Sequence, residues 1–232
     1  MSDEEIDRKI AVIFATDVVG YSKHMETDES ETVKNLRACE KVLMGLFDKH
    51  KARLFNTGGD SFLAEFPSAV SAIECAVEFQ NAIKERNASD KATVKLEFRI
   101  GINSGDVIKE KGNLLGDGVN IAARLEALAQ TGGITISKGV YDFVKGKTNF
   151  EFNDLGIQKV KQNEFHAFDI LLDENRKRKP KKSININPAK AIMITVVFIL
   201  LVAVSIIVVQ RNNFFGEQLG QKEKKVASTQ ID

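Results

Sequence analysis

The sequence is poor in cysteine and begins without the apolar stretch that a secretory signal requires. Two cysteines, Cys39 and Cys75, occur among 232 residues, and neither stands at a spacing typical of metal ligands. The residues from Ser2 to Lys9 are mostly charged, which argues against a secretory signal. We therefore expect a reducing, cytosolic compartment in which both thiols are buried as small apolar side chains.

The chain also lacks an excess of charge of one sign, an internal repeat and a P-loop. Its 33 Lys and Arg residues balance 32 Asp and Glu residues, so the formal net charge of +1 gives no reason to expect nucleic acid as a partner. Hydrophobic residues make up 43% and charged residues 28% of the chain, as in a globular domain. The length suits one domain of ordinary size with residues left over.

The stretch from Leu115 to Glu126 carries the strongest functional signal. Two glycines bracket Asp117, and apolar residues then recur at near-helical spacing, which predicts a tight turn leading into a helix. Asn120 and Arg124 stand four residues apart, so both lie on one face of that helix. A guanidinium binds phosphate in a bidentate fork and a helix N-terminus favours anions, so the pair suits a phosphate or sugar ligand. A solvated polar face is the alternative, and the spacing alone leaves both open.

Two aspartates follow predicted strands. Residues 8–15 predict a buried strand, and a carboxylate just after it, at Asp17, is costly to bury unless it meets a cation. Residues 53–66 predict a β-hairpin with a glycine pair and Asp60 at its tip. Asp17 is therefore a candidate metal ligand, with a simple turn or cap as the alternative. Asp60 taken alone is a common turn residue.

These segments together resemble the catalytic domain of the class III nucleotidyl cyclases, the adenylate and guanylate cyclases. The resemblance runs from about Ile10 to Leu172. It implies that Asn120 positions the ribose and that Arg124 stabilises the transition state. It also implies two Mg²⁺ or Mn²⁺ ions per site. The resemblance assigns the metal to Asp17, Val18 and Asp60, and the triphosphate to Val19, Gly20, Tyr21, Ser22 and Lys161; a solvated loop position is the alternative for Lys161.

The activity implied by the resemblance is that of a lyase in signal transduction. The ribose 3′-oxygen of ATP attacks the α-phosphorus, and 3′,5′-cyclic AMP and pyrophosphate form by two-metal catalysis. Class III sites lie between two subunits, with the aspartates from one and the Asn and Arg from the other. One chain carries both sets here, so we expect a head-to-tail homodimer with two equivalent sites.

The positions that read the base depart from both standard patterns. Adenylate cyclases usually have a lysine and an aspartate where this chain has Asn56 and Asn113, and guanylate cyclases typically have a glutamate and a cysteine. An asparagine amide both donates and accepts hydrogen bonds, so it could pair with several bases. ATP is favoured by resemblance to bacterial chains alone, with a guanylate or pyrimidine nucleotide cyclase as the alternative.

Two further alternatives differ in class. Gly58-Gly59-Asp60 partly resembles the hairpin of diguanylate cyclases, but Ser61 stands where that family continues with an acidic residue, and that family lacks the Asn-Arg helix. The domain could also be an inactive nucleotide-binding sensor anchored at the membrane. The joint presence of both aspartates with Asn120 and Arg124 argues against the sensor.

The order strand, helix, hairpin, helix, strand predicts an α+β fold with a ferredoxin-like βαββαβ palm core and a C-terminal extension of further strands. A turn at 104–106 is expected to separate two strands, and a loop at 156–163 to join the last two. The catalytic domain is expected over residues 1–172.

An apolar run near the C-terminus predicts a transmembrane helix. Residues 191–209 carry no charge, and nineteen residues span about 28 Å of the roughly 30 Å hydrocarbon core. Residues 173–190 form a basic juxtamembrane linker, expected near anionic lipid headgroups, and 210–232 a short polar tail. Seven Lys or Arg residues precede the run and four follow it. We therefore expect a single pass through the cell inner or plasma membrane with the catalytic domain cytoplasmic.

Overall fold

The computed structural model describes residues 6–89, 93–160, 163–173 and 177–178. The chain divides into two units, residues 1–181 and 182–232, and every described residue lies in the first. The predicted transmembrane segment 191–209, the tail 210–232 and Lys161 lie outside the described residues, as does most of the linker 173–190. No helix in the described part of the chain is long and apolar enough to span a membrane.

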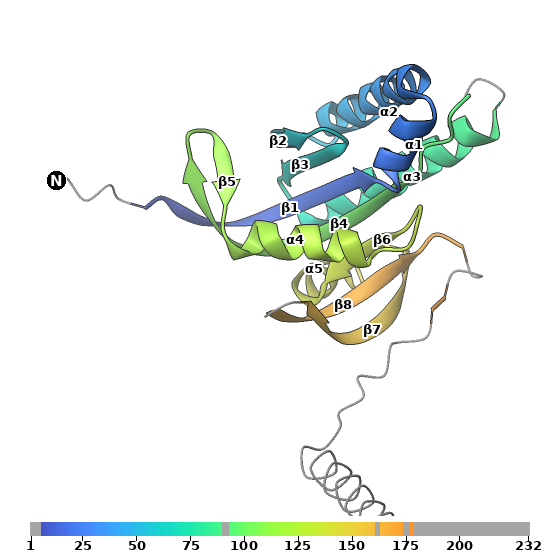
Figure 1. Ribbon diagram of the computed structural model, residues 1–232. Coiled ribbons are helices and arrows are strands. Elements are labelled where there is room, and N and C mark those ends of the chain that lie inside the picture. The colour runs from blue at the N-terminus through green and yellow to red at the C-terminus, as the bar shows by residue number, and fades with distance from the viewer. Residues whose placement is uncertain (1–5, 90–92, 161–162, 174–176, 179–232) are drawn as a thin grey trace, which may run out of the picture. The chain divides into compact units, whose positions relative to one another are not determined.

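The described residues form an eight-stranded mixed sheet (Figure 1). Its order is β2-β3-β1-β4-β6-β8-β7, and the short β5 pairs only with β4. The strands are β1 (Arg8–Val18), β2 (Arg53–Gly58), β3 (Ser61–Phe66), β4 (Phe98–Glu110), β5 (Asn113–Leu115), β6 (Ile134–Ser137), β7 (Glu151–Val160) and β8 (Asn163–Leu171).

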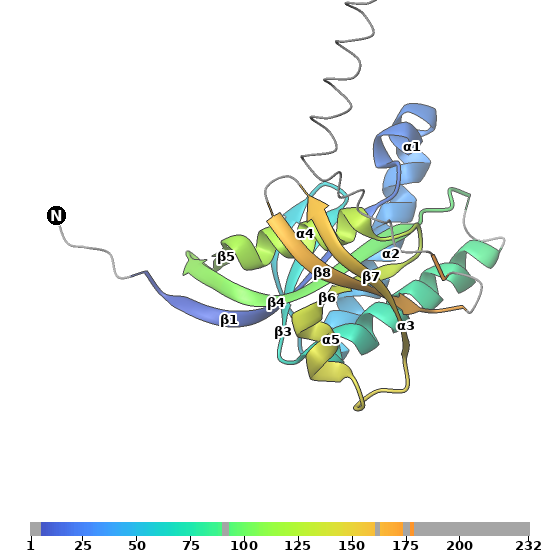
Figure 2. The same cartoon turned by 90° about the horizontal axis from the view of Figure 1, so that it is seen from below.

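Helices cover both faces of the sheet (Figures 1 and 2). Buried side chains of α2, α3 and α5 share one apolar cluster with the sheet, whereas α4 packs in separate clusters with the side chains of the opposite face. The N-termini of α2, α3 and α5 are capped by the side chains of Asp28, Ser68 and Ser137. Asp28, for example, accepts a hydrogen bond from the Glu31 amide. The helices are α1 (Tyr21–Thr27), α2 (Glu29–Lys49), α3 (Ala69–Ala88), α4 (Asp117–Leu128) and α5 (Lys138–Val144).

The predicted ferredoxin-like core is confirmed. Strands β2, β3, β1 and β4 lie side by side in that order, and all neighbouring pairs among them are antiparallel. Strand β6 then joins β4 in parallel, and the β8–β7 hairpin completes the C-terminal extension (Figure 2).

Two local predictions were wrong. Residues 104–106 form no turn, because Ser104 and Gly105 continue the ladder with β1 by pairing with Val12 and Ala11. The expected loop at 156–163 is largely strand, since β7 continues through a bulge at Leu155, next to Gly156, whose φ is +70°. In both places strand pairing prevails over the local turn preference of the sequence.

The core follows from the alternation of side chains along β1. Phe14 points to the α2 and α3 face, where its ring centroid lies 5.5 Å from those of Phe47 and Phe66. Ile13 and Ala15, its neighbours, point to the α4 face. Both cysteines are buried free thiols, as predicted, and burial raises the pKa of the Cys75 thiol to about 12.

Glycines bring α4 into direct contact with the backbone of β4. A Cβ atom on Gly101 would lie 2.1 Å from the Glu126 nitrogen and 2.3 Å from the Ala122 oxygen. At the other end of the helix, a Cβ on Gly105 would lie 3.2 Å from the Gly118 Cα. The position of α4 on the sheet therefore depends on the absence of these side chains.

We predict that Gly101→Ala destabilises the fold by about 3 kcal/mol or more, because backbone atoms of α4 must move to admit the methyl group. Urea unfolding of the full chain measures this. Gly45→Ala is the matched control, since Gly45 lies in α2 with no atom within 4 Å of the added Cβ. It should raise stability by up to about 1 kcal/mol. Equal effects of the two substitutions would contradict the close packing of α4.

Candidate active site

The two predicted metal ligands lie together at one end of the sheet. Asp17 is the penultimate residue of β1, and Asp60 occupies the turn between β2 and β3, where β3 pairs with β1 up to Thr16. The backbone N–H of Val18 donates a hydrogen bond to the Asp60 carboxylate. Burial raises the pKa of Asp60, and the negative charge of Asp17 raises it further.

Arg99 neutralises Asp17 and was missed in the sequence. It is the direct cross-strand partner of Asp17, and its Nε and Nη2 donate to the two carboxylate oxygens at 3.1 and 2.5 Å. The only available signal was the register of β1 against β4, which a single sequence does not reveal. The pair is a bidentate, charge-assisted contact at the edge of the candidate metal site.

Glu126, at the C-terminal end of α4, is the second residue that the sequence did not reveal. Its side chain is 12% exposed, and Arg99 Nη2 lies 3.0 Å from its Oε1 without the alignment of a hydrogen bond. Burial raises the pKa of Glu126 to about 8, and a hydrogen bond with Asp17 and that residue's charge contribute to the rise. The Glu126 carboxyl is therefore mostly protonated at neutral pH.

The donor set fits divalent cations. Asp17 and Asp60 offer adjacent carboxylates, the hard oxygen ligands that Mg²⁺ and Mn²⁺ prefer. Among the described residues, Arg99 is the cation that lies near both aspartates, so two carboxylates share one positive charge at this end of the sheet. Within the described residues no three His, Cys, Asp or Glu side chains form a metal-binding group. A metal here would rely on the two aspartates and the Val18 backbone.

The turn after β1 presents several backbone amides. Gly20 has φ +66° and precedes α1, and the amides of Tyr21 and Ser22 stand in the first turn of that helix, where no intrahelical acceptor exists. The Val19 amide differs, because it donates to the Glu97 carbonyl at 2.8 Å. Of the four residues predicted to cradle a triphosphate, Val19 therefore has its amide already bonded, whereas Tyr21 and Ser22 stand at a helix N-terminus.

Asn120 and Arg124 point away from the aspartates of their own chain. At about 100° per residue they lie about 40° apart around α4, whereas Glu126, which faces Asp17, lies about 160° from Arg124. Asn120 is exposed. Arg124 is half-buried, and its Nη1 is buried without a hydrogen-bond partner in the described part of the chain. An unsatisfied guanidinium N–H is suited to an anionic ligand.

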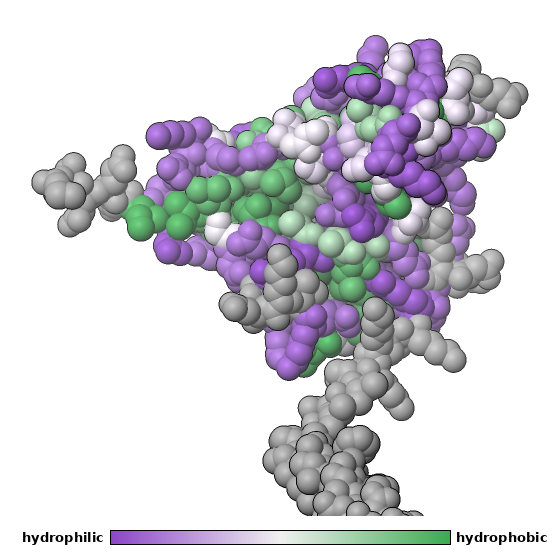
Figure 3. All heavy atoms as spheres, viewed as in Figure 1, coloured by the Kyte–Doolittle hydropathy of each residue, from purple (hydrophilic) through white to green (hydrophobic). Residues whose placement is uncertain are grey.

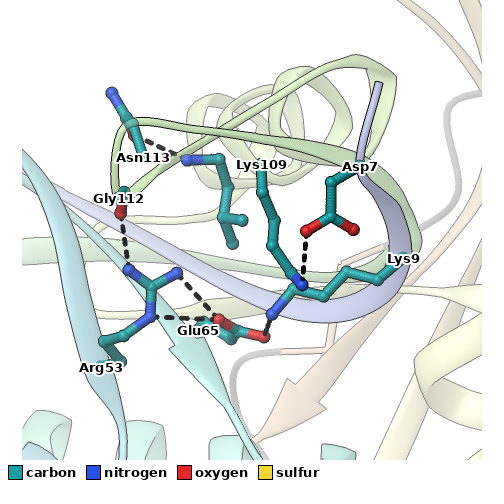
Figure 4. Close-up of polar contacts among 8 residues, drawn as sticks. Asp7, Lys9, Arg53, Glu65, Lys109, Gly112 and Asn113 are labelled. Atoms are coloured by element: carbon teal, nitrogen blue, oxygen red, sulfur yellow. Dashed lines mark hydrogen bonds and ion pairs between the residues drawn. The ribbon is translucent and has the colours of Figure 1, made fainter. Parts of the chain in front are cut away.

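A polar network lies beside Asn113, one of the two predicted base-reading residues (Figure 4). Arg53 of β2 donates to the Gly112 carbonyl at 2.6 Å and pairs with Glu65, so it ties β2 to the turn between β4 and β5. Asn56 follows on β2 and is exposed. Asn113 follows that turn, and its Oδ1 accepts a hydrogen bond from the Leu114 amide at 2.8 Å. The amide NH₂ of Asn113 remains as its donor.

Within one copy of the chain, Asn113 lies far from Asp17 and Asp60. Asp17 pairs with Arg99 near the start of β4, whereas Asn113 pairs with Glu110 at its end. Eleven residues of strand separate the two positions, about 36 Å at the usual rise. Asn113 therefore lies far from Asp17 and Asp60, which we call the aspartate set. Asn120 and Arg124, the Asn–Arg set, lie on the face of α4 turned away from Glu126.

Comparison with known proteins decides the family. The family described as the adenylate and guanylate cyclase catalytic domain matches residues 3–172. The chain belongs to this family. The cyclase domain is 44% identical over 165 residues to "Putative adenylate cyclase 3" of Rhizobium meliloti, which covers 71% of this chain and 28% of that protein. It is 34% identical over 128 residues to the adenylate cyclase of Streptomyces coelicolor, which covers 55% of this chain and 32% of that one.

A solved structure supports the same relationship. The cyclase domain is similar to the adenylate/guanylate cyclase/hydrolase from Silicibacter pomeroyi, with a TM-score of 0.66 and 33% identity over 73% of this chain and 100% of that one. The chain thus spans a whole solved domain of the family but about a third or less of the length of the two curated relatives.

The raised pKa of Glu126 predicts how stability depends on pH. The folded cyclase domain keeps this proton up to about pH 8, whereas the unfolded chain loses it above about 4.5. The free energy of unfolding should therefore fall as pH rises between these values, because the folded domain retains the proton that the unfolded chain releases.

Glu126→Gln should remove this fall and be more stable than the unmodified chain at pH 8 and above. Urea unfolding from pH 5 to 9 with EDTA measures the difference. Glu74→Gln, at an exposed position on α3, is the control and should keep the pH dependence. An unchanged slope in Glu126→Gln would contradict a neutral, buried Glu126.

Proposed function

We propose that the chain is an adenylate cyclase that converts ATP to 3′,5′-cyclic AMP and pyrophosphate at sites shared by two copies. The observation that carries the proposal is the paired Asp17 and Asp60 on a domain whose α4 presents Asn120 and an unsatisfied Arg124. Phosphoryl chemistry needs both parts: carboxylates for divalent cations, and a fixed cation for the charge that develops on phosphate.

The aspartate set would hold two Mg²⁺ or Mn²⁺ ions through Asp17, Asp60 and the Val18 backbone. When bound, such ions lower the pKa of a hydroxyl and offset charge on phosphate oxygens. The amides of Gly20, Tyr21 and Ser22 would hold the β- and γ-phosphates, together with Lys161. Val19 contributes to the turn, since its own amide is already bonded to Glu97.

The Asn–Arg set would come from the second copy. Asn120 would orient the ribose by hydrogen bonding, and Arg124 would place its guanidinium on the α-phosphate as negative charge grows there. A head-to-tail homodimer with two equivalent sites follows, because each copy carries both sets. Exposed apolar side chains support such a contact: Ile6 and Ile10 are 60% and 70% exposed, and an apolar strip follows this end of β1 (Figure 3).

ATP is the substrate we favour. Two relatives above 30% identity bear the name adenylate cyclase. The geometry is compatible with adenine: the free NH₂ of Asn113 could donate to a ring nitrogen, and the Asn56 oxygen could accept from the exocyclic amino group. Anchoring of the enzyme by residues 191–209, with the domain on the cytoplasmic side of the inner or plasma membrane, belongs to the same proposal.

The test is to incubate the full chain with ATP, GTP, CTP or UTP and Mn²⁺, and to identify cyclic product and pyrophosphate by chromatography and mass. We expect 3′,5′-cyclic AMP from ATP, and no product from Asp60→Asn, which removes one carboxylate charge at little cost in shape. Cyclic product from another base would keep the mechanism and replace ATP. No product from any nucleotide, in a dimeric sample that binds nucleotide, would favour the inactive sensor.

The variant Asn56→Lys/Asn113→Asp restores the usual adenine-reading pair and tests the base site in the same assay. The turnover of ATP relative to GTP should rise about tenfold or more, since a matched hydrogen bond in a buried site is worth at least this factor. An unchanged ratio would remove Asn56 and Asn113 from base recognition.

A further inference from the structure

The last described residue, Arg178, is bound in a polar pocket at the C-terminal end of α4. Its Nε lies 2.5 Å from Oδ2 of Asp169 and its Nη2 2.7 Å from Oδ1, a bidentate pair. Its Nη1 donates to the carbonyl of Leu128, the last residue of α4, at 2.9 Å. One side chain thus joins three parts of the chain: the described residues 177–178, here called the C-terminal segment, strand β8 and helix α4.

The pocket is built for a guanidinium. Asp169 is 7% exposed, and its Oδ1 also accepts a hydrogen bond from the Thr135 hydroxyl at 2.7 Å. Asn153, which is 4% exposed, donates from its side chain to the backbone carbonyl of Arg178 at 2.8 Å, so the main chain of the segment is held as well. Without Arg178, Asp169 would be a buried carboxylate lacking its counter-charge, which is strongly unfavourable.

The contact with Leu128 places a positive charge at the negative end of the α4 dipole. Leu128 lies four residues, about one helical turn, after Arg124. The pocket therefore fixes the end of the helix that carries Asn120 and Arg124.

Arg178 belongs to a basic run that the sequence assigned to the lipid surface. The structure instead pairs this arginine with Asp169, whereas its neighbour Lys177 is exposed. Twelve residues, 179–190, separate Arg178 from the apolar run at 191–209. The chain that leads to this run is thus bound to the end of α4 through Arg178.

We propose that Arg178 is a positioning residue: it ties the C-terminal segment to the end of α4 and thereby holds Asn120 and Arg124 in the geometry that turnover requires. A loosened helix end displaces both side chains, and displacements of about 1 Å can cost up to about a hundredfold in rate. The turnover part rests on the proposed cyclase activity; the tie between the segment and α4 does not.

The experiment compares four variants of the full chain: Arg178→Met, Asp169→Asn/Arg178→Met, the conservative Arg178→Lys, and Lys177→Met as the matched control. Arg178→Met should lower the urea concentration at the midpoint of unfolding and reduce kcat about tenfold or more, with a smaller change in KM. Arg178→Lys should recover part of kcat, and Lys177→Met should change neither quantity.

The double variant separates positioning from stability. It removes the buried unpaired charge, so the unfolding midpoint should return toward that of the unmodified chain while kcat stays low, because the end of α4 remains untied. Recovery of kcat together with the midpoint would reduce Arg178 to a structural role and overturn the proposal. So would an unchanged kcat in Arg178→Met.

Hydrogen exchange gives a readout that needs no activity. Amides at the C-terminal end of α4, residues 125–128, should exchange about tenfold faster in Arg178→Met and in the double variant than in Lys177→Met. If the chain lacks cyclase activity but this difference is found, the proposed function fails and the tie stands. Equal exchange in all variants would overturn the tie itself.

Discussion

The contact of α4 with the bare backbone of β4 is the constraint on which the rest of the site depends. At Gly101, Gly105 and Gly118 the backbones of helix and strand approach without an intervening side chain, so the helix has little freedom to rotate or slide. With α4 fixed in this way, Glu126 reaches Arg99 and Asp17, and the turn geometry of the helix directs Asn120 and Arg124 to the other side. The proposed division of the site between two copies rests on this packing.

The charges around Asp17 and Asp60 favour the binding of cations. Asp17 and Asp60 lie at the end of β1 beside the buried carboxyl of Glu126, and Arg99 supplies positive charge to the two aspartates. Two of the three carboxyl groups respond with a raised pKa, mainly through burial. Divalent cations would relieve this shortage of positive charge, and an unsatisfied Arg124 from another copy would meet the phosphates that such cations bind.

Much of the fold could be predicted from the sequence, because its elements have local signals. The βαββαβ order, the hairpin that carries Asp60 and the glycine turn before α4 are all legible in one chain. Arg99 and Glu126 were missed since their importance comes from strand register and helix packing, which are not local. The turn predicted at residues 104–106 was wrong for the same reason. Ser, Gly and Asp favour a turn locally, but pairing with β1 holds them in an extended strand. In the sequence Arg178 is only one charge of a basic run, and its partner Asp169 on β8 cannot be read from it.

The most direct test of the divided site is to mix two inactive chains. Asp17→Ala lacks the aspartate set and Arg124→Ala lacks the Asn–Arg set, so each homodimer should be inactive with ATP and Mn²⁺. A mixed dimer would contain one intact site, and the account predicts that mixing restores activity, approaching about a quarter of that of the unmodified chain when subunits exchange at random. If mixed dimers form, as two different affinity tags would reveal, and activity stays absent, the two sets do not act across copies and the account is wrong.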